Sequence, residues 1–457
     1  MQATGQADVD WPAPAATGPV RATIRLPGSK SITNRALILA ALADTPTRIT
    51  GPLQARDTDL MAGAVTALGA AVDGWTGQPG STSTQLTEQA WTVTPGWASG
   101  AIGVDVGNAG TVLRFVPPVA ALAAGEVRFA GDARAAHRPV GQLLAGLRQA
   151  GVEVDDDGRG AVPFVVRGRG RVRGGTVTLD ASSSSQLVSG LMLAAPRYEQ
   201  GLQITHNGPR IPSAPHIAMT AAMLTAAGAE VESGGTGGNH GTGRNNGVPE
   251  FWRVRPGRLN PGPITVEPDL SNAAAFLASA LVTGGRITIP GWPAVSLQAA
   301  SQILDVLEQM GGVCQVTADG LRIEGAGRVR GITADLRDIN ELAPVLTAVA
   351  ALADGPSEFT GIGHMRLHES DRLAVLAGEI GALGGQVTEL PDGLRIVPRP
   401  LRAGPQPLDS HDDHRMVMAA AVLGLVVPGL RVRNAGTVAK TFPAFLALWQ
   451  QMLEHAP

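Results

Sequence analysis

Short runs of alternating apolar and polar residues recur along the chain, and each is followed by a turn and an amphipathic helical pattern. The alternation is typical of half-buried strands, and apolar residues three and four positions apart are typical of helices. The strand-like runs lie at residues 48–51, 127–131, 203–207, 287–291, 358–361 and 430–434. Glycine follows the helical pattern at Gly151, Gly228, Gly311 and Gly384, which predicts left-handed caps at these helix ends.

A second type of helix alternates with the first; it is rich in alanine and leucine and opens on a cluster of polar residues. These clusters recur about every 76 residues. They lie at residues 29–35, 108–111, 184–186, 269–272, 338–341 and 412–415. The chain is therefore predicted to consist of six α/β units, each with the order strand, helix, strand, helix and further strand. Such a unit buries its faces only against neighbouring units.

The composition narrows the class of protein. The 457 residues are 44% hydrophobic and 16% charged, with a formal net charge of −3. At roughly 150 residues per domain, this length predicts two or three domains. The near balance of charge argues against nucleic-acid binding. We find neither a secretory signal nor a membrane-spanning segment, so we expect a cytoplasmic protein without membrane contact.

Several features argue against disulfide, metal and cofactor chemistry. The single Cys314 excludes an internal disulfide and a thiolate zinc cluster. Asp412 and Asp413 adjoin His414 and Arg415, but no HxH or HExxH spacing accompanies them, so we expect no metal and no cofactor. Glycine-rich or small polar stretches at 77–100 and 233–247 are interpreted as surface loops, since the second lacks the GxxxxGK[ST] spacing.

The polar helix starts indicate anion binding. A helix N-terminus offers unpaired N–H groups and the positive end of the helix dipole. Any single start of this kind is typical of an ordinary cap, but the set also brings cations to helix starts. These cations are Lys30, Arg35, Arg138, Arg372, Arg415 and Lys440. If the repeats turn their polar ends toward one another, the cations form one anion-binding region.

Glu341, His368 and Glu369 are the candidates for proton transfer. A carboxylate among cations can carry a proton, and histidine titrates near neutral pH. Each residue taken alone would more often be a salt-bridge partner. Together with the cations, they indicate catalysis on an anionic substrate.

These segments resemble the 5-enolpyruvylshikimate-3-phosphate synthase family. The resemblance covers residues 26–35, 107–111, 138–139, 184–186, 368–372, 413–416 and 439–443, in the family's order. It implies a two-domain inside-out α/β barrel of six βαβαββ repeats, three per domain, which agrees with the repeat count above. It further implies an N-terminal globular domain (28–266) on the shikimate 3-phosphate side. A C-terminal globular domain (1–27 and 267–457) would carry the phosphoenolpyruvate-binding and catalytic residues.

The resemblance implies transfer of the enolpyruvyl group of phosphoenolpyruvate to the 5-hydroxyl of shikimate 3-phosphate, in the shikimate pathway toward chorismate and the aromatic amino acids. The implied shikimate 3-phosphate ligands are Lys30, Ser31, Arg35, Ser184, Ser185, Gln186, Ser213, Glu341 and His368. The implied phosphoenolpyruvate ligands are Lys30, Asn108, Gly110, Arg138, Gln186, Arg372, Arg415 and Lys440. The implied catalytic residues are Lys30, Glu341, His368 and Glu369. We expect a monomer whose partners are these two small-molecule substrates.

The sequence departs from the family pattern at several of these positions. His368 stands where many members have lysine, and Glu341 replaces the commoner aspartate. Phe115 follows Arg114 where many members have proline. The histidines at 364 and 216 occupy positions often held by asparagine and tyrosine. These changes leave open which group donates the proton and whether the protein is sensitive to glyphosate.

Two alternative functions remain. The related enolpyruvyl transferase that acts on UDP-N-acetylglucosamine shares the implied fold, but it typically uses a loop cysteine, and residues 109–140 contain none. A non-catalytic anion-binding repeat protein would tolerate the substitutions but leaves the pairing of His368 with Glu369 unexplained.

Overall fold

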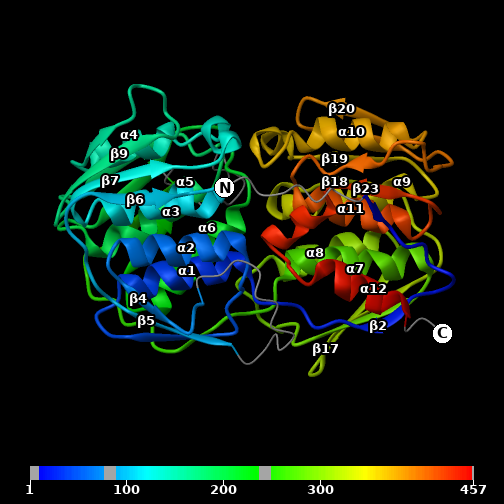
Figure 1. Cartoon of the computed structure of the whole chain (residues 1–457), viewed down its shortest axis with the longest axis horizontal. Helices are drawn as coiled ribbons and strands as arrows, with labels where there is room; N and C mark the ends of the chain where they lie inside the picture. The colour runs from blue at the N-terminus through cyan, green and yellow to red at the C-terminus, as the bar shows by residue number, and fades with distance from the viewer. Residues whose placement is uncertain (1–9, 77–88, 236–248, 455–457) are drawn as a thin grey trace, which may run out of the picture. The chain divides into compact units, whose positions relative to one another are not determined.

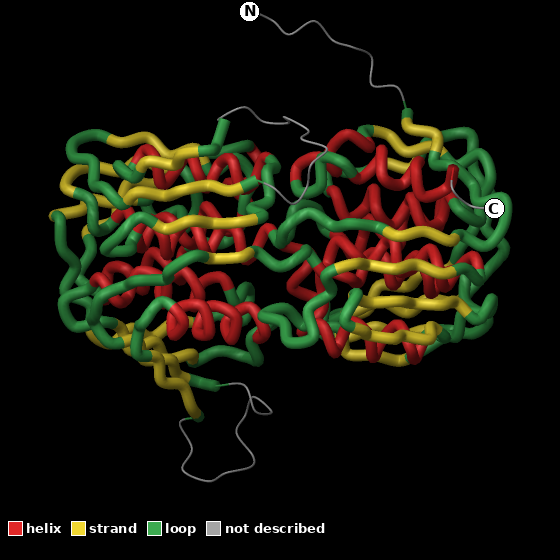
Figure 2. The backbone as a smooth tube through the Cα atoms, turned by 90° about the horizontal axis from the view of Figure 1, so that it is seen from below, coloured by secondary structure: helices red, strands yellow, loops and turns green. Residues whose placement is uncertain are grey.

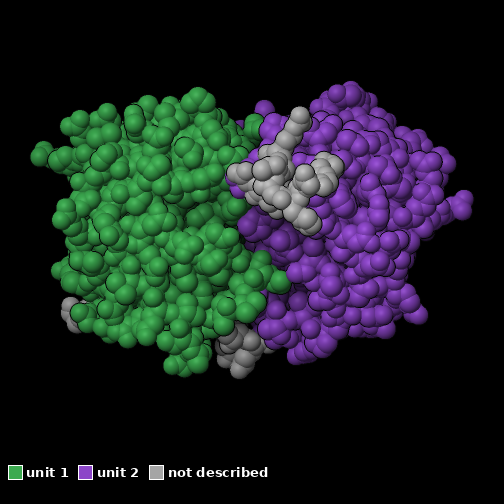
Figure 3. Space-filling view, turned by 180° about the vertical axis from the view of Figure 1, so that it is seen from behind, with its two compact units in different colours: residues 1–26, 268–457 green, residues 27–267 purple. Residues whose placement is uncertain are grey.

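The computed structural model describes residues 10–76, 89–235 and 249–454, which divide into two compact units (Figure 3). Unit 1 consists of Met1–Leu26 and Pro268–Pro457, and unit 2 of Pro27–Glu267. The expected loops at 77–100 and 233–247 lie partly outside the described residues. In the part of the chain that is described, no helix is long and apolar enough to cross a membrane.

Two types of helix alternate along the chain, as the sequence pattern predicts. The alanine- and leucine-rich helices are buried on nearly every side, and those of one unit contact one another in its interior. They are α1 (Lys30–Ala41), α3 (Gly110–Ala120) and α5 (Gln186–Ala194) in unit 2, and α7 (Leu270–Thr283), α9 (Ala343–Ala351) and α11 (His414–Gly424) in unit 1. The amphipathic helices are α2 (Arg56–Ala67), α4 (Gly141–Gln149), α6 (Ala214–Ala226), α8 (Ala300–Gln309), α10 (Arg372–Ala382) and α12 (Phe445–Glu454) (Figure 1).

The polar clusters lie where these interior helices begin. Ser29, Asp269 and Asp413 are N-cap residues whose side chains accept a backbone N–H from the first turn. The cluster at 338–341 is an exception, because it forms the 3₁₀ turn η3 (Arg337–Leu342) directly before α9. The six-unit pattern thus places one polar opening on each interior helix.

Five four-stranded sheets and one three-stranded sheet cover the helices of the described chain, and Figure 2 shows strands over the outside of each unit. In unit 2, the first sheet has the strand order β14 (Ile264–Thr265), β3 (Thr47–Thr50), β5 (Ala90–Thr94) and β4 (Ala71–Asp73). The second has the order β6 (Ile102–Asp105), β7 (Ala124–Ala130), β9 (Phe164–Arg169) and β8 (Glu153–Asp155). The third has the order β10 (Gly175–Leu179), β11 (Leu202–His206), β13 (Phe251–Val254) and β12 (Val231–Gly234). In unit 1, one sheet has the strand order β16 (Gly312–Thr317), β17 (Gly320–Gly325), β15 (Arg286–Pro290) and β2 (Arg21–Thr23). A second has the order β18 (Thr333–Asp335), β19 (Ser357–Thr360), β21 (Gly393–Val397) and β20 (Gln386–Leu390). The three-stranded sheet has the order β1 (Trp11–Pro12), β23 (Arg431–Arg433) and β22 (Leu408–Asp409).

One parallel strand pair in each sheet is joined through an interior helix, except where the chain passes between the units. β6 and β7 flank α3 and pair in parallel, as β18 and β19 do around α9. Around α1 and α7 the partners are exchanged. β2 precedes α1 but pairs with β15 of unit 1, and β14 precedes α7 but pairs with β3 of unit 2. Unit 1 therefore takes one strand from the segment before the chain passes into unit 2, and unit 2 takes one from the segment just before the chain returns to unit 1.

The glycines after the amphipathic helices have the predicted left-handed conformation. Their φ angles are 91° at Gly151, 92° at Gly228, 108° at Gly311 and 90° at Gly384. A side chain there would be strained. These glycines end the helix and return the chain to the sheet.

Candidate active site

Arg372 is the centre of a buried ion cluster in unit 1. It begins α10, and its side chain has no solvent exposure. Its Nε and Nη2 atoms donate to the two carboxylate oxygens of Asp413, at 2.8 and 3.1 Å. Asp413 also accepts the backbone N–H of Arg415 at 2.9 Å and the hydroxyl of Ser370 at 3.0 Å. The N-cap of α11 therefore fixes the guanidinium group.

The remaining donors of Arg372 hold the three predicted catalytic residues of unit 1. Nη1 lies 3.3 Å from Glu341 Oε2 and 3.1 Å from His368 Nδ1, and Nη2 lies 3.0 Å from Glu369 Oε2. Burial lowers the pKa of an arginine, but the surrounding carboxylates raise that of Arg372 above its usual value. Arg372 is therefore a permanent cation.

Glu341 is shared between two arginines. Its Oε2 lies 3.3 Å from Arg372 Nη1 and 3.3 Å from Arg415 Nε, while 31% of its side chain remains exposed. Burial alone would raise the pKa of Glu341, but the charges of Arg372 and Arg415 outweigh it and hold the pKa well below the usual range. Glu341 is thus an accessible, ionised carboxylate.

His368 lies in an environment that works against the near-neutral titration expected from its residue type. Burial, and after it the charge of Arg372, lower the pKa of His368 to about 3. Because a guanidinium group can only donate, His368 Nδ1 accepts from Arg372, and the proton of the neutral ring lies on Nε2. His364 packs edge-on against it, with ring centroids 5.4 Å apart, and burial lowers the pKa of His364 to about 4.

Lys440 ends the 3₁₀ turn η5 (Ala435–Lys440) in unit 1 and is 7% exposed. The turn begins at Asn434, which has a left-handed φ of 50° and donates from Nδ2 to Asp412 Oδ1. After the turn, the ring of Phe442 packs 6.0 Å from that of Phe276 on α7. Both ends of the segment that carries Lys440 are therefore fixed.

In unit 2 the predicted phosphoenolpyruvate ligands Gly110, Arg138 and Gln186 converge at one point. A Cβ atom at Gly110 would lie 2.6 Å from Arg138 Nη2 and 3.0 Å from Gln186 Oε1. Arg138 is buried, and its Nη1 donates to the carbonyl of Asn108 at 2.7 Å. The absence of a side chain at Gly110 leaves the start of α3 open beside a guanidinium group.

Lys30 lies on the first turn of α1 in the same unit. Its Nζ donates to Asp57 Oδ2 at 3.2 Å, and Asp57 is buried in the first turn of α2. The side chain of Lys30 remains 21% exposed. An anchored but accessible ammonium group is suited to bind an anion.

Arg35, an implied shikimate 3-phosphate ligand, is almost fully buried in unit 2. It is 1% exposed, and its donors reach Thr220 Oγ1 at 2.7 Å and the carbonyls of Ser31 and His216 at 3.0 Å each. Its guanidinium carbon lies 5.0 Å from the ring centroid of Phe115. Burial lowers the pKa of Arg35 to about 9. These contacts show Arg35 holding α1 to α6.

The predicted serine ligands lie at three helix starts of unit 2, with Ser31 in the first turn of α1. Ser184 and Ser185 precede α5, and Ser184 Oγ accepts the N–H of Gln186 at 3.2 Å. Ser213 is the N-cap of α6 and has a left-handed φ of 54°. A non-glycine residue in this conformation is strained, and such residues cluster at functional sites.

Two charged residues that complete these clusters were not predicted as site residues. Asp413 was recognised only as part of a motif, although an aspartate one position before a helix signals an N-cap. Asp57 lies in an acidic first turn of α2, and nothing local indicates its pairing with Lys30. In the described ranges, no group of three histidine, cysteine or acidic residues could hold a metal ion.

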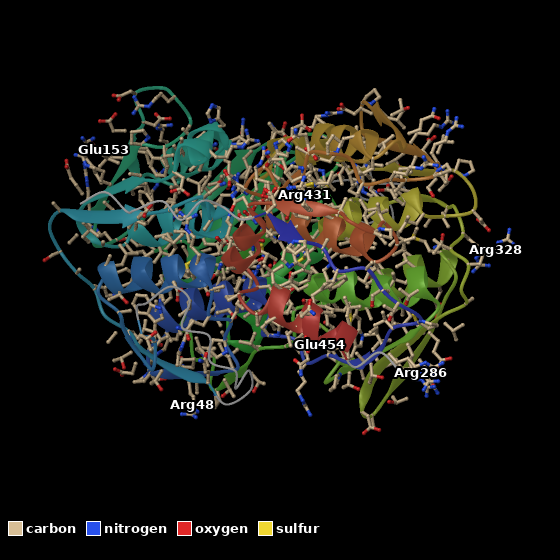
Figure 4. The ribbon with its side chains drawn as sticks, turned by 45° about the vertical axis from the view of Figure 1, so that its right-hand side comes forward. Arg48, Glu153, Arg286, Arg328, Arg431 and Glu454 are labelled. Carbon is tan, nitrogen blue, oxygen red and sulfur yellow. The ribbon has the colours of Figure 1, made fainter. Side chains whose placement is uncertain are left out.

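Other cations of the chain pair at the surface, outside these clusters. Arg286 and Arg431, labelled in Figure 4, lie 2.8 Å from Glu324 and 3.2 Å from Asp10. Exposed pairs of this kind contribute little to stability. The cations of the chain therefore fall into two groups: those held in the clusters described above and those paired at the surface.

The chain is related in sequence and in fold to EPSP synthases. The family model of EPSP synthase (3-phosphoshikimate 1-carboxyvinyltransferase) matches residues 14–449. An EPSP synthase structure from Acinetobacter baumannii superimposes with a TM-score of 0.74 and 23% identity over 97% of each chain. The enolpyruvyl transferase NikO from Streptomyces tendae superimposes with a TM-score of 0.69 and 18% identity over 96% of each chain. These likenesses confirm the predicted fold class.

Proposed function

The chain belongs to the EPSP synthase family, and we propose that it transfers the enolpyruvyl group of phosphoenolpyruvate to the 5-hydroxyl of shikimate 3-phosphate, releasing phosphate. The observation that carries this proposal is the cluster in which Arg372 holds Glu341 and Glu369 beside Arg415. An enolpyruvyl transferase needs cations for its anionic donor and carboxylates for the proton transfers, and this cluster supplies both.

The chemistry assigns each part of the cluster a role. A proton is added to the methylene carbon of phosphoenolpyruvate, and the hydroxyl oxygen attacks the adjacent carbon. Phosphate then leaves as a proton is withdrawn from the new methyl group. Carboxylates stabilise the positive charge that develops on the attacked carbon. Ionised Glu341 is suited to accept the hydroxyl proton, and Glu369 to move the proton at the methylene carbon.

The remaining residues bind the two anionic substrates. Lys30, Arg138 and the open start of α3 would hold phosphate oxygens, and the serines before α5 would receive the acceptor phosphate. Arg372, Arg415 and Lys440 would hold phosphoenolpyruvate. Neutral His368 would donate a hydrogen bond from Nε2 to the acceptor rather than supply a charge.

The test is phosphate release by the purified protein. We expect release with phosphoenolpyruvate and shikimate 3-phosphate together, and none with either alone. Replacing shikimate 3-phosphate by UDP-N-acetylglucosamine should abolish release. Turnover with the sugar nucleotide and not with shikimate 3-phosphate would instead assign the chain to the related transferase. Binding of both substrates without turnover would leave an anion-binding protein.

A further inference from the structure

The connection between β22 and α11 in unit 1 has an unusual backbone conformation. His411 and Asp412 have φ angles of 50° and 56°, so two successive non-glycine residues are left-handed. Residues of this kind are strained, and they persist where surrounding contacts hold them. Asp413, the N-cap of α11, follows directly. The conformation of this turn therefore determines where Asp413 lies.

Glu379 on α10 holds the turn with both of its carboxylate oxygens. Oε1 lies 3.0 Å from His411 Nε2, and Oε2 accepts the backbone N–H of Asp409 at 3.1 Å. Asp409 Oδ1 accepts the backbone N–H of His411 at 2.7 Å, which closes a ring of three contacts. Since an ionised carboxylate only accepts, His411 carries a proton on Nε2 in this contact. An exposed ion pair alone contributes little, but this carboxylate also fixes the backbone before Asp413.

Arg372 and Glu379 attach α10 to the two ends of this connection. They are seven residues apart, close to two helical turns, so their side chains leave the same face of α10. Arg372 binds both carboxylate oxygens of Asp413, while Glu379 binds Asp409 and His411. Because the connection is held at two points, it cannot turn about either of them, and the second attachment limits the movement of Asp413.

The same connection is attached to the turn that carries Lys440. Ser410 Oγ donates to the carbonyl of Asn434 at 3.1 Å, and Asn434 Nδ2 donates to Asp412 Oδ1. The backbone N–H of Asp413 donates to the carbonyl of Ser410 at 2.9 Å. The connection therefore joins α10, α11 and η5, which carry the three phosphoenolpyruvate ligands proposed for unit 1.

From these contacts we propose that Glu379 is a positioning residue for the transfer reaction. Its carboxylate holds the left-handed turn at His411, and this turn places Asp413. Asp413 orients Arg372 and accepts the backbone N–H of Arg415. Glu379 itself lies about 10 Å along the helix axis from Arg372, so it acts through the turn and not on substrate. The inference rests on the proposed function, because the residues that Glu379 positions are the phosphoenolpyruvate ligands.

Glu379→Ala removes both contacts, and steady-state phosphate release measures the effect. We expect KM for phosphoenolpyruvate to rise at least about tenfold, while KM for shikimate 3-phosphate changes little because its proposed phosphate ligands lie in unit 2. Glu379→Gln should restore most of the wild-type KM, since its amide can accept from Asp409 and donate to the other tautomer of His411. Glu358→Ala, which removes an exposed partner of Arg395, is the matched control.

Hydrogen exchange measures the turn without requiring turnover. The amides of residues 409–415 should exchange faster in Glu379→Ala than in the wild type, in Glu379→Gln and in Glu358→Ala. His411→Asn covers the case in which Glu379→Ala does not fold, because asparagine adopts the left-handed conformation but lacks the ring nitrogen that contacts Glu379. This variant should raise KM for phosphoenolpyruvate about threefold or more.

The inference is overturned if folded Glu379→Ala keeps the wild-type KM for phosphoenolpyruvate or the wild-type exchange. It is also overturned if the KM values of both substrates rise equally, if Glu379→Gln is as impaired as Glu379→Ala, or if His411→Asn has the wild-type KM. Absence of turnover in the wild type is a different result, because it overturns the proposed function and the positioning role together.

Discussion

Arg372 and Asp413 form a fully buried bidentate ion pair, with Nε 2.8 Å from one carboxylate oxygen and Nη2 3.1 Å from the other. The pair joins the start of α10 to the N-cap of α11. It also orients the guanidinium group so that its other N–H groups reach Glu341, His368 and Glu369. Asp413 therefore positions the proposed catalytic carboxylates without contacting substrate.

The first prediction concerns the stability of this pair. Asp413→Asn leaves the charge of Arg372 buried without its main partner, and we expect the free energy of unfolding to fall by about 3–5 kcal/mol. Urea unfolding followed by circular dichroism measures the change. Glu358→Gln, which breaks an exposed pair with Arg395, is the control and should change stability by less than about 0.5 kcal/mol. Equal effects of the two changes would contradict the assigned role of Asp413.

The second prediction separates catalysis from binding at Glu341. Glu341→Gln keeps the shape of the side chain but removes the carboxylate that is suited to accept the hydroxyl proton. We expect kcat to fall about 10²-fold or more, while KM for the acceptor changes little. Steady-state phosphate release measures both constants, with Glu358→Gln again as the control. A loss seen only in KM would assign Glu341 to binding alone.

The third prediction concerns pH and the two neutral histidines. His368 and His364 have folded-state pKa values of about 3 and about 4, whereas an unfolded histidine titrates near pH 6.5. The unfolded chain therefore binds more protons below about pH 6.5, so stability declines as pH falls from about 6.5 toward 4.

The double variant His364→Asn, His368→Gln should show a smaller decline. Urea midpoints at pH 7.5 and pH 5 provide the measurement, and His137→Gln, at an exposed site, is the control. The same decline in the double variant and in the wild type would show that these histidines do not stay neutral in the folded protein.

The fourth prediction tests the open start of α3. Gly110→Ala places a methyl group 2.6 Å from Arg138 Nη2, so the guanidinium group must move. We expect KM for phosphoenolpyruvate to rise at least about tenfold, because a displaced guanidinium loses a charge-assisted hydrogen bond. Gly378→Ala, where nothing lies within 4 Å of the added Cβ, is the control. An unchanged KM in Gly110→Ala would remove this helix start from the phosphoenolpyruvate site.

The fifth prediction concerns Asn434, the left-handed residue that begins the turn carrying Lys440. Asn434→Gly keeps the φ of 50° without strain but removes the hydrogen bond to Asp412. We therefore expect a rise in KM for phosphoenolpyruvate with little loss of stability. Asn434→Val should in addition destabilise the protein by about 1–3 kcal/mol. Paired kinetics and urea unfolding give both readouts. If Asn434→Val were as stable as Asn434→Gly, the assigned strain would be absent.

The repeat pattern was predictable because it is local. A glycine after each amphipathic helix and a polar cluster before each interior helix are signals within a few residues of the element they mark. The exchange of β2 and β14 was not predictable from the pattern, since strand pairing across more than 200 residues leaves no local trace. Only the resemblance indicated that the chain crosses near these positions.

The site was predictable in its residue types but not in its electrostatics. The motifs supplied Arg372, Glu341 and His368, yet the lowered pKa of His368 follows from burial and from a neighbour that only the fold provides. The contacts of Arg35 could not be predicted from the sequence either. Its four-residue spacing from Ser31 places both residues on one face of α1, but it does not indicate that the guanidinium group donates to residues of α6. The pKa of His368 and the contacts of Arg35 both depend on side chains from helices that are distant in the sequence.

Phosphorus NMR of the wild-type protein with equimolar phosphoenolpyruvate and shikimate 3-phosphate follows the proposed transfer itself. We expect the phosphoenolpyruvate signal to be lost and inorganic phosphate to appear in equal amount, while the acceptor keeps its phosphate and its signal shifts to that of the enolpyruvyl ether. Phosphate released from shikimate 3-phosphate, or no change in either substrate while both bind, would contradict the proposed transfer.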